Sequence, residues 1–270
     1  MSNGGAGFAG VDCERALRNL RSRSVNYCPE DVDDRNWNFD THRTALPPEQ
    51  PGPPEAAGTW ETAAALIRDY EFSEPQVVRA VYDPTEPLLN RTMLLEGRFA
   101  ALRLHLGVRI TDVIDETRPQ GQHAWGWSYD TLQGHLERGR LTYEVVKHQD
   151  SGHVEFVINA HSQPAPTLGP VLRLGWAVFG RRCQLLFYRD CARRMNQLVR
   201  TPPDQQSPHA PETSYWPPQT PSRTRSTGSR CTAPIPAETA PRARSDHHPP
   251  ATSRPGRAPW TCAVVHGASW

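Results

Sequence analysis

Alternation of apolar and polar residues predicts β-strands in the middle of the chain. Residues 98–115 alternate over many positions, which predicts one long strand or two strands broken at Gly107. Residues 122–130 alternate in the same way. So do residues 140–161, where a short polar link at residues 149–152 predicts a hairpin. Because short links join these stretches, we expect them to form an antiparallel sheet.

Two other stretches have the spacing of apolar residues that is typical of amphipathic helices. Residues 59–70 have one apolar face and begin with Thr59, a suitable N-cap. Residues 180–200 have the most regular pattern, with an expected inward face of Cys183, Leu186, Phe187, Cys191, Met195 and Leu198. The outward residues are mainly arginines, which is typical of a solvated helix face. The order of elements predicts an α+β fold in which a curved antiparallel sheet packs on a long C-terminal helix.

The distribution of prolines divides the chain into three predicted segments. Residues 1–58 are interpreted as an N-terminal arm with a Pro-rich connector, because the prolines of residues 47–58 remove backbone donors and restrict φ. Residues 59–200 are predicted to form the α+β domain. Fourteen of the 27 prolines follow residue 200, where helical and strand patterns end, so residues 201–270 are predicted to be a disordered tail.

Charge and composition narrow the classes of function. The chain has 30 lysines and arginines against 29 acidic residues, and a net charge of +1 does not favour a nucleic-acid partner. No apolar stretch approaches the roughly 20 residues of a membrane span, and the start lacks the apolar core of a signal peptide, so we expect a cytoplasmic protein. The six cysteines form no C-x-x-C pair and the 11 histidines form no H-E-x-x-H motif, so neither a metal nor a cofactor is predicted.

The strand over residues 122–130 has large aromatic residues on one face, namely Trp125, Trp127 and Tyr129. Such a stripe has two interpretations. It can be part of an ordinary sheet core, or it can form the wall of a cavity for a flat apolar molecule.

The loop TLQGHLERG, residues 131–139, is the other candidate for chemistry. His135 has a side-chain pKa that is ordinarily close to neutrality, and Glu137 is the nearest carboxylate in the sequence. The glycines of the loop suit positions with positive φ. The loop therefore either provides a general acid or base, or only connects two strands.

The stretch WGWSYDTLQGHLERGRLTYEVVKHQDSGHVEFVINAHSQPA resembles the central signature of uncharacterised protein family 0548, a family of unknown function found in bacteria and plants. The matching residues are Thr131, Leu132, Gly134, His135, Glu137, Gly139, Ser162 and Pro164. Asp130, Gln133 and His161 depart from the pattern, where glycine, proline and an aromatic residue are common. The likeness covers roughly residues 59–200. It implies no known activity, and its order of elements is similar to that of the helix-grip proteins, which include lipid carriers, hormone receptors and aromatic cyclases.

The leading hypothesis is a cytoplasmic module that binds a small apolar or aromatic molecule between sheet and helix. The residues expected to contact it are Trp125, Trp127, Tyr129, His135, Glu137, Arg98 and His161. One alternative is an enzyme of cyclase or hydrolase type with His135 as general acid or base. Another is a protein-interaction module that uses the Pro-rich tail. The oligomeric state stays open.

Overall fold

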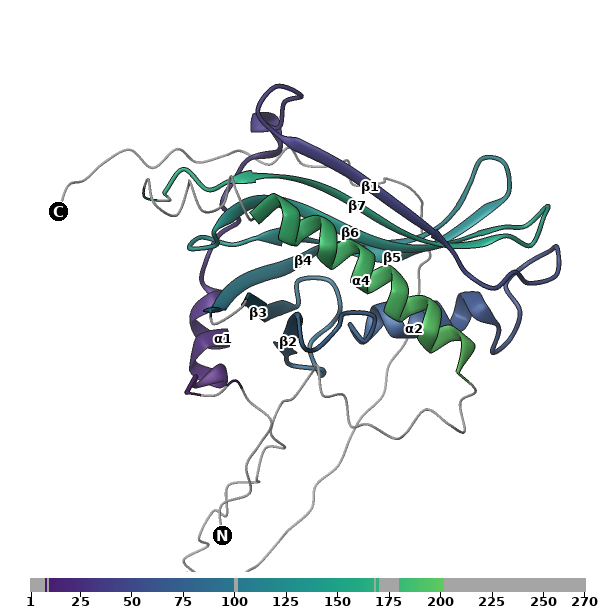
Figure 1. Ribbon diagram of the computed structural model, residues 1–270, viewed down its shortest axis with the longest axis horizontal. Coiled ribbons are helices and arrows are strands. Elements are labelled where there is room, and N and C mark those ends of the chain that lie inside the picture. The colour runs from purple at the N-terminus through teal and green to yellow at the C-terminus, as the bar shows by residue number, and fades with distance from the viewer. Residues whose placement is uncertain (1–7, 9, 100–101, 168, 170–179, 202–270) are drawn as a thin grey trace, which may run out of the picture. The chain divides into compact units, whose positions relative to one another are not determined.

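Seven antiparallel strands form a curved sheet in the computed structural model, which describes residues 8, 10–99, 102–167, 169 and 180–201. Their order across the sheet is β1-β7-β6-β5-β4-β3-β2. The strands are β1 (Asn38–Ala45), β2 (Val78–Tyr82), β3 (Thr92–Phe99), β4 (Leu102–Arg118), β5 (Gln122–Thr131), β6 (Glu137–His148) and β7 (Val154–Pro164). Figure 1 shows the sheet bending around the long helix α4 (Arg181–Arg200). The predicted α+β fold, with a curved sheet packed on a C-terminal helix, is confirmed.

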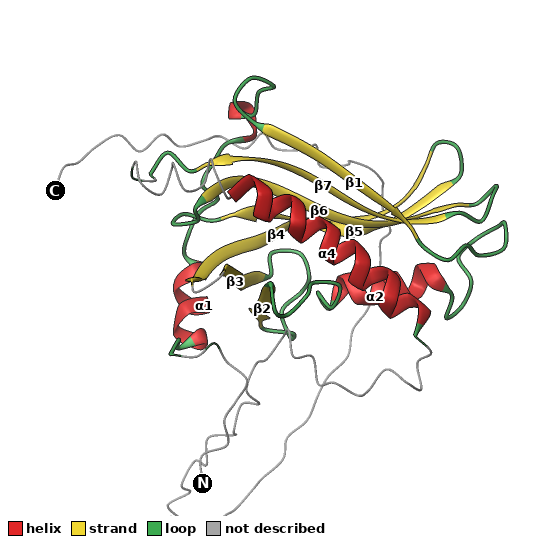
Figure 2. Ribbon diagram, in the orientation of Figure 1, coloured by secondary structure: helices red, strands yellow, loops and turns green. Residues whose placement is uncertain are grey.

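Two faces of this sheet carry different helices (Figure 2). Helix α2 (Thr59–Arg68) contacts β5, β6, β7 and α4, and it covers the inner face together with α4. Helix α1 (Cys13–Arg21) contacts β3 on the outer face, where its Leu17 and Leu20 cluster with Leu94. The neighbouring Leu95 belongs to the inner core, because successive side chains of a strand point to opposite faces.

The inner core is dominated by aromatic rings. The largest fully or almost fully buried aromatic side chains are Tyr70, Phe72, Trp127, Tyr143, Phe156 and Tyr188. The closest pair, Phe72 and Tyr143, has ring centroids 4.5 Å apart in a tilted arrangement. Complete burial of one such ring stabilises the fold by roughly 1.5–3 kcal/mol. The aromatic stripe of residues 122–130 therefore takes part in holding the sheet to its helices.

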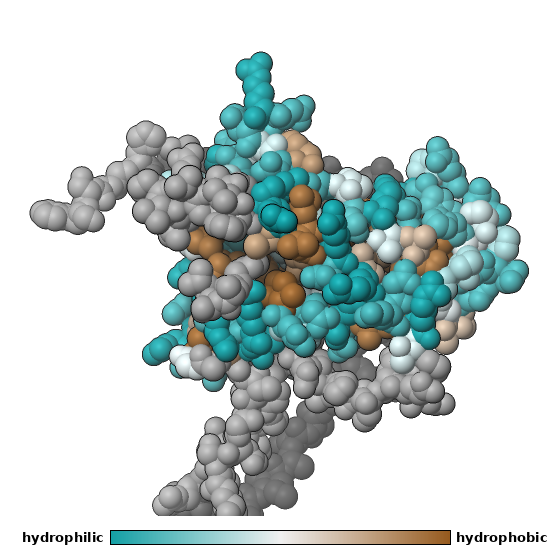
Figure 3. All heavy atoms as spheres, in the orientation of Figure 1, coloured by the Kyte–Doolittle hydropathy of each residue, from teal (hydrophilic) through white to brown (hydrophobic). Residues whose placement is uncertain are grey.

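The buried face of α4 differs by part of a turn from the predicted one. Cys191 and Met195 are buried as predicted, but Leu186 is 48% exposed, and Tyr188 takes the inward position in the first half of the helix. Figure 3 shows apolar side chains gathered over the region of α4 on a mostly hydrophilic face. The prediction for Leu186 is wrong because two adjacent leucines, Leu185 and Leu186, widen the apolar stripe in the sequence beyond the face that is buried; both are exposed, at 38% and 48%.

Residues 98–115 do not form a single strand, and the chain does not break at Gly107. Strands β3 and β4 pair directly, with Phe99 opposite Leu102. The reversal changes the parity of the alternation, so that Arg98 and Arg103 are paired opposite each other and share a face. The two residues between the strands, 100 and 101, are both alanine, so no glycine, proline or asparagine marks the reversal in the sequence.

Part of the predicted N-terminal arm belongs to the folded unit. Residues 38–45 form β1, which pairs with β7 along its whole length, and Val25 forms a bridge with Leu132. The boundary expected at residue 59 is therefore too late. Strand β1 was not predicted because residues 38–45 lack a clear alternation of apolar and polar residues. Except for Thr201, the predicted disordered tail lies outside the described residues.

A buried ion pair connects the Pro-rich connector to the sheet. Lys147 on β6 donates to Glu49 at 2.6 Å and to the carbonyl oxygen of Pro53 at 2.8 Å. Glu49 also accepts the N–H of Trp60 at 2.6 Å, in the first turn of α2. Thr59 was predicted to cap this helix, but the N-cap position is occupied by Gly58, and the carboxylate of Glu49 satisfies a free N–H instead.

Candidate functional site

Two pockets lie beside the loop that connects β5 to β6, and His135 lines both. The outer pocket has a volume of about 540 Å³ and is lined by Val25, Asn26, Tyr27, Cys28, Asp31, Gln133, Gly134, His135, Ala165, Pro166 and Thr167. The inner pocket has about 40 Å³ and is lined by Tyr129, Thr131, His135, Glu137, Gly139, Arg140, Leu141, Ser162 and Gln184. His135 is therefore the residue shared by a pocket large enough for a small molecule and by the much smaller inner pocket.

The inner pocket is formed largely by the residues that carry the predicted family resemblance. Thr131, His135, Glu137, Gly139 and Ser162 come from the ends of three neighbouring strands and their connecting loop, and all line this pocket. Helix α4 contributes Gln184, whose side-chain amide donates to the hydroxyl of Ser162 at 3.0 Å. The motif residues thus meet where the sheet and the first turns of α4 come together.

Backbone geometry explains why His135 is held at this place. The N–H of His135 donates to the carbonyl oxygen of Leu132, which closes the turn, and Gly134 has φ of +89°. The N–H of Glu137 then donates to Nδ1 of His135 at 2.9 Å. Nδ1 also lies 3.0 Å from the carbonyl oxygen of Glu137. In either tautomer of the neutral imidazole the backbone of Glu137 therefore contacts Nδ1, and Nε2 is the ring nitrogen left to accept or donate a hydrogen bond.

The His135 ring is uncharged near neutral pH. Burial lowers the pKa of His135 to about 4, and the contact with the backbone of Glu137 offsets only part of this effect. Such a group offers Nε2 of a neutral ring for hydrogen bonding at pH 7, and it is a weaker base than an exposed histidine. Glu137 contacts the His135 ring through its backbone in these hydrogen bonds. From the sequence, the carboxylate of Glu137 was the expected partner.

We expect the stability of the protein to fall between about pH 6.5 and pH 4 because of His135. In that window the unfolded chain binds a proton at this residue and the folded chain does not, so acid favours unfolding by about 1–3 kcal/mol. The measurement is equilibrium urea unfolding of the protein and of His135→Asn at pH 4.5 and pH 7.5. The variant should show a smaller loss at acid pH, whereas equal losses in both proteins would contradict the assignment.

Of the aromatic stripe, Tyr129 is the residue that reaches a pocket. Tyr129 lines the inner pocket, while Trp125 and Trp127 line neither of the two pockets beside the loop. Trp127 is buried and its Nε1 donates to the carbonyl oxygen of Ile67 at 3.0 Å. Arg68 lies over the ring of Trp125, 5.0 Å from its centroid. These contacts attach both tryptophans to helix α2.

Tyrosine hydroxyls extend the polar character of the inner pocket into the core. The hydroxyls of Tyr70, Tyr143 and Tyr188 are buried, and those of Tyr70 and Tyr143 interact with each other. Burial raises the pKa of Tyr129 and of Tyr143, and the two phenols are close enough to affect each other's pKa. All of these phenols are therefore neutral donors at physiological pH.

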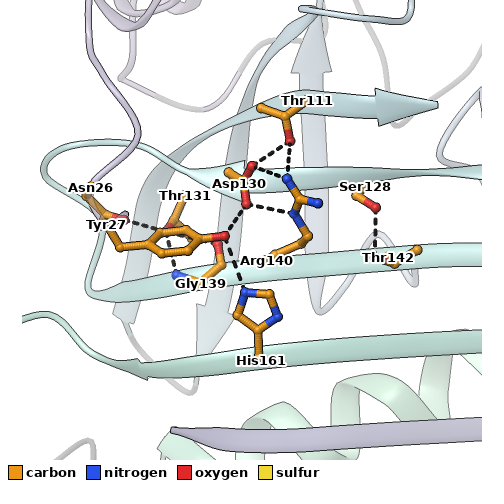
Figure 4. Close-up of polar contacts among 10 residues, drawn as sticks. All are labelled: Asn26, Tyr27, Thr111, Ser128, Asp130, Thr131, Gly139, Arg140, Thr142 and His161. Carbon is orange, nitrogen blue, oxygen red and sulfur yellow. Dashed lines mark hydrogen bonds and ion pairs between the residues drawn. The ribbon is translucent and has the colours of Figure 1, made fainter. Parts of the chain in front are cut away.

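His161 lies on the outer face of the sheet, away from Tyr129. Figure 4 shows it beside Tyr27, Asp130 and Arg140. The hydroxyl of Tyr27 is 3.3 Å from Nε2 of His161 and donates to Asp130 at 2.5 Å. Arg98 is also on the outer face, where it pairs with Glu96 on β3. The structure therefore does not bring His161 and Arg98 together with the aromatic stripe.

Asp130 is the centre of this outer network. Burial would raise the pKa of Asp130, but hydrogen bonds from Arg140, Thr111 and Tyr27 lower it, so the carboxylate stays ionised. Arg140 donates to both of its oxygens, at 3.0 Å and 2.9 Å. Asp130 and Arg140 are paired across β5 and β6, so a correct hairpin register would have predicted them from sequence. No strand pairing in the sequence could have predicted Tyr27 as a partner of Asp130, because Tyr27 lies in the N-terminal arm.

Within the described residues, the side chains do not suggest a metal centre or a membrane span. No group of three or more histidine, cysteine, aspartate or glutamate side chains is arranged there to hold a metal ion. None of the helices in that part of the chain is long and apolar enough to cross a bilayer.

Comparisons with known proteins found several solved structures with a similar fold. No curated protein matches the chain. Similar solved structures include a hypothetical protein from Helicobacter pylori, with 9% identity and a TM-score of 0.42 over 65% of this chain and 96% of that one. Major latex-like protein 151 from Panax ginseng has 8% identity and a TM-score of 0.36, over 60% and 96% of the two chains. A norcoclaurine synthase mutant from Thalictrum has 9% identity and a TM-score of 0.36, over 60% and 94%.

The match to a family model is direct. The model of a domain of unknown function, DUF1990, matches residues 24–194, which include the loop motif, both pockets' strands and most of α4. The match begins in the N-terminal arm, in agreement with the position of β1 in the sheet. The resemblance predicted from the loop motif is thereby confirmed, and the chain belongs to the DUF1990 family of domains of unknown function.

Proposed function

We propose that this protein binds a small, uncharged molecule with an apolar or aromatic body and one hydrogen-bonding group. The observation that carries the proposal is the position of His135, which lines both the outer pocket and the inner pocket of motif residues. The outer pocket, at about 540 Å³, is within the usual range of about 300–1,000 Å³ for small-molecule sites. The inner pocket, at about 40 Å³, has room for a single polar group or a water.

The lining of the outer pocket supports an uncharged ligand. It has apolar groups from Val25, Ala165 and Pro166 and the ring of Tyr27, but no lysine or arginine. Its one carboxylate, Asp31, pairs with Arg138 at 3.9 Å. His135 is neutral at pH 7, so an anion would find no compensating charge among these lining residues. A neutral hydroxyl, which both donates and accepts, can instead bond with Nε2 of His135 in either tautomer.

The uncharged aromatic dye N-phenyl-1-naphthylamine is a suitable probe. We expect its fluorescence to increase on binding to the full chain. The affinity should fall about tenfold in His135→Asn, the effect of losing the hydrogen bond of about 1.4 kcal/mol that the N–H of the dye donates to Nε2. Thr167→Trp should weaken binding as well, because the exposed Thr167 lines the outer pocket and the larger ring fills it.

The matched control is His153→Asn. His153 is exposed in the turn between β6 and β7 and lines neither pocket, so this variant should bind the dye like the unmodified protein. Equal dye affinities in all four proteins, or no binding to the unmodified protein, would refute the proposal. Melting temperatures measured in parallel separate a loss of binding from a loss of fold.

A catalytic role for His135 and an interaction role for the Pro-rich tail stay predictions. With a pKa of about 4, His135 is poorly suited to accept a proton at pH 7. Residues 202–270 of the tail lie outside the described residues. The described contacts therefore favour binding as the function of the pockets.

A further inference from the structure

A buried carboxylate on the outer face is surrounded by an excess of positive charge. Glu96 on β3 is completely buried, and its carboxylate pairs with Arg98 at 2.7 Å, Arg79 at 3.2 Å and Arg103 at 3.4 Å. His105, opposite Glu96 on β4, lies 3.8 Å from the same carboxylate. Hydrogen bonds from Arg98 and the charges of Arg79 and Arg98 lower the pKa of Glu96, although burial opposes them.

The charges of this cluster do not balance. One carboxylate faces three guanidinium groups, so two positive charges are left before His105 is considered. In the described part of the chain, the ion pairs of these arginines reach no other acidic residue. The adjacent stretches of sequence, residues 1–9 and 99–102, contain no aspartate or glutamate. The cluster is therefore a site of net positive charge.

Glu96 also holds the guanidinium groups in place. Each guanidinium has five N–H donors, and the contacts with Glu96 use only a few of them. Arg98 is 31% exposed and Arg103 is 51% exposed, so both present unused donors to solvent. Arg79 is covered by the ring of Phe8, 5.1 Å away, and contributes mainly charge.

We propose that Arg98 and Arg103, oriented by Glu96, bind the phosphate group of a small molecule on the outer face of β3 and β4. Phosphate suits this site because it accepts several charge-assisted hydrogen bonds at once, and guanidinium groups match its geometry. The site is separate from the pockets at His135, which are lined by other residues, and it does not rest on the function proposed for them.

Titration of the full chain with inorganic phosphate and with pyrophosphate, at constant ionic strength, tests the proposal. We expect both anions to bind and to raise the melting temperature above that in sodium chloride of equal ionic strength. Arg98→Gln and Arg103→Gln should each weaken binding about tenfold, the loss of roughly 1.4 kcal/mol from a charge-assisted contact. Arg103 is half exposed and contacts Glu96 at 3.4 Å, so its replacement is expected to leave the fold intact.

Arg189→Gln is the control of equal charge change, since Arg189 is exposed on α4. It should bind phosphate within about twofold of the unmodified protein. The proposal is overturned if phosphate has no effect beyond that of ionic strength, or if Arg189→Gln weakens binding as much as Arg103→Gln. Binding to vesicles of phosphatidic acid without binding of inorganic phosphate would also overturn it.

Discussion

Replacing Lys147 with methionine is expected to lower the free energy of unfolding by about 3–5 kcal/mol. The variant leaves the carboxylate of Glu49 buried without its cation, and the loss of one partner of a buried ion pair usually costs this much. Lys147 is the only lysine in the 270 residues, and its side chain is fully buried. Equilibrium unfolding in urea, followed by tryptophan fluorescence and circular dichroism, measures the change.

A pair with an exposed arginine provides the control. Arg43 pairs with Glu155 at 2.8 Å, and its side chain is 58% exposed, whereas Glu155 is buried and also contacts Nε2 of His148 at 3.1 Å. Because Glu155 keeps this second partner, Arg43→Met should cost no more than about 1 kcal/mol. The double variant Lys147→Met with Glu49→Gln should recover part of the loss, since no charge is then left buried. A cost for Lys147→Met as small as that for Arg43→Met would show that the connector is not held by this pair.

Replacing Gly139 with alanine is expected to destabilise the protein by about 2–5 kcal/mol and to weaken dye binding. A Cβ at this position would lie 2.1 Å from the carbonyl oxygen of His161, and the φ of +155° is rarely adopted by residues with a side chain. Gly139 also lines the inner pocket, so movement of β6 away from β7 would change the position of the pocket walls. Urea unfolding and the N-phenyl-1-naphthylamine titration measure the two effects.

Gly121→Ala separates the two sources of this cost. Gly121 has φ of +69°, but the nearest atom to an added Cβ is 3.9 Å away, on Gln149. This variant should therefore show only the conformational cost of about 1–2 kcal/mol, with unchanged dye binding. If both variants lose the same stability, the close approach of β6 and β7 at Gly139 contributes nothing.

The loop motif predicted the centre of the candidate site, but not all of its surroundings. Thr131, His135, Glu137 and Gly139 are within nine residues of one another, so their proximity follows from the sequence. Ser162 and Gln184 meet them only because β7 pairs with β6 and α4 packs across the strand ends. The pattern of residues within a strand does not show which distant strand will pair with it.

The position of His161 illustrates the limit of a prediction made from residue type. His161 was grouped with the aromatic stripe, although alternation separates it from Ala160 and Ser162 on the inner face. The structure places it against Tyr27, 134 residues away in the chain. A histidine near a motif in the sequence can therefore be on the opposite side of the sheet.

The sequence by itself determined the types of the main elements, the antiparallel meander and the family motif, because periods of two and 3.6 residues are local properties of strands and helices. Only the tertiary structure decided that residues 38–45 complete the sheet, that the chain reverses between Phe99 and Leu102, and that Lys147 is buried against Glu49, 98 residues away. Such pairings depend on which surfaces exclude water together, and this is settled by the packing of the whole chain.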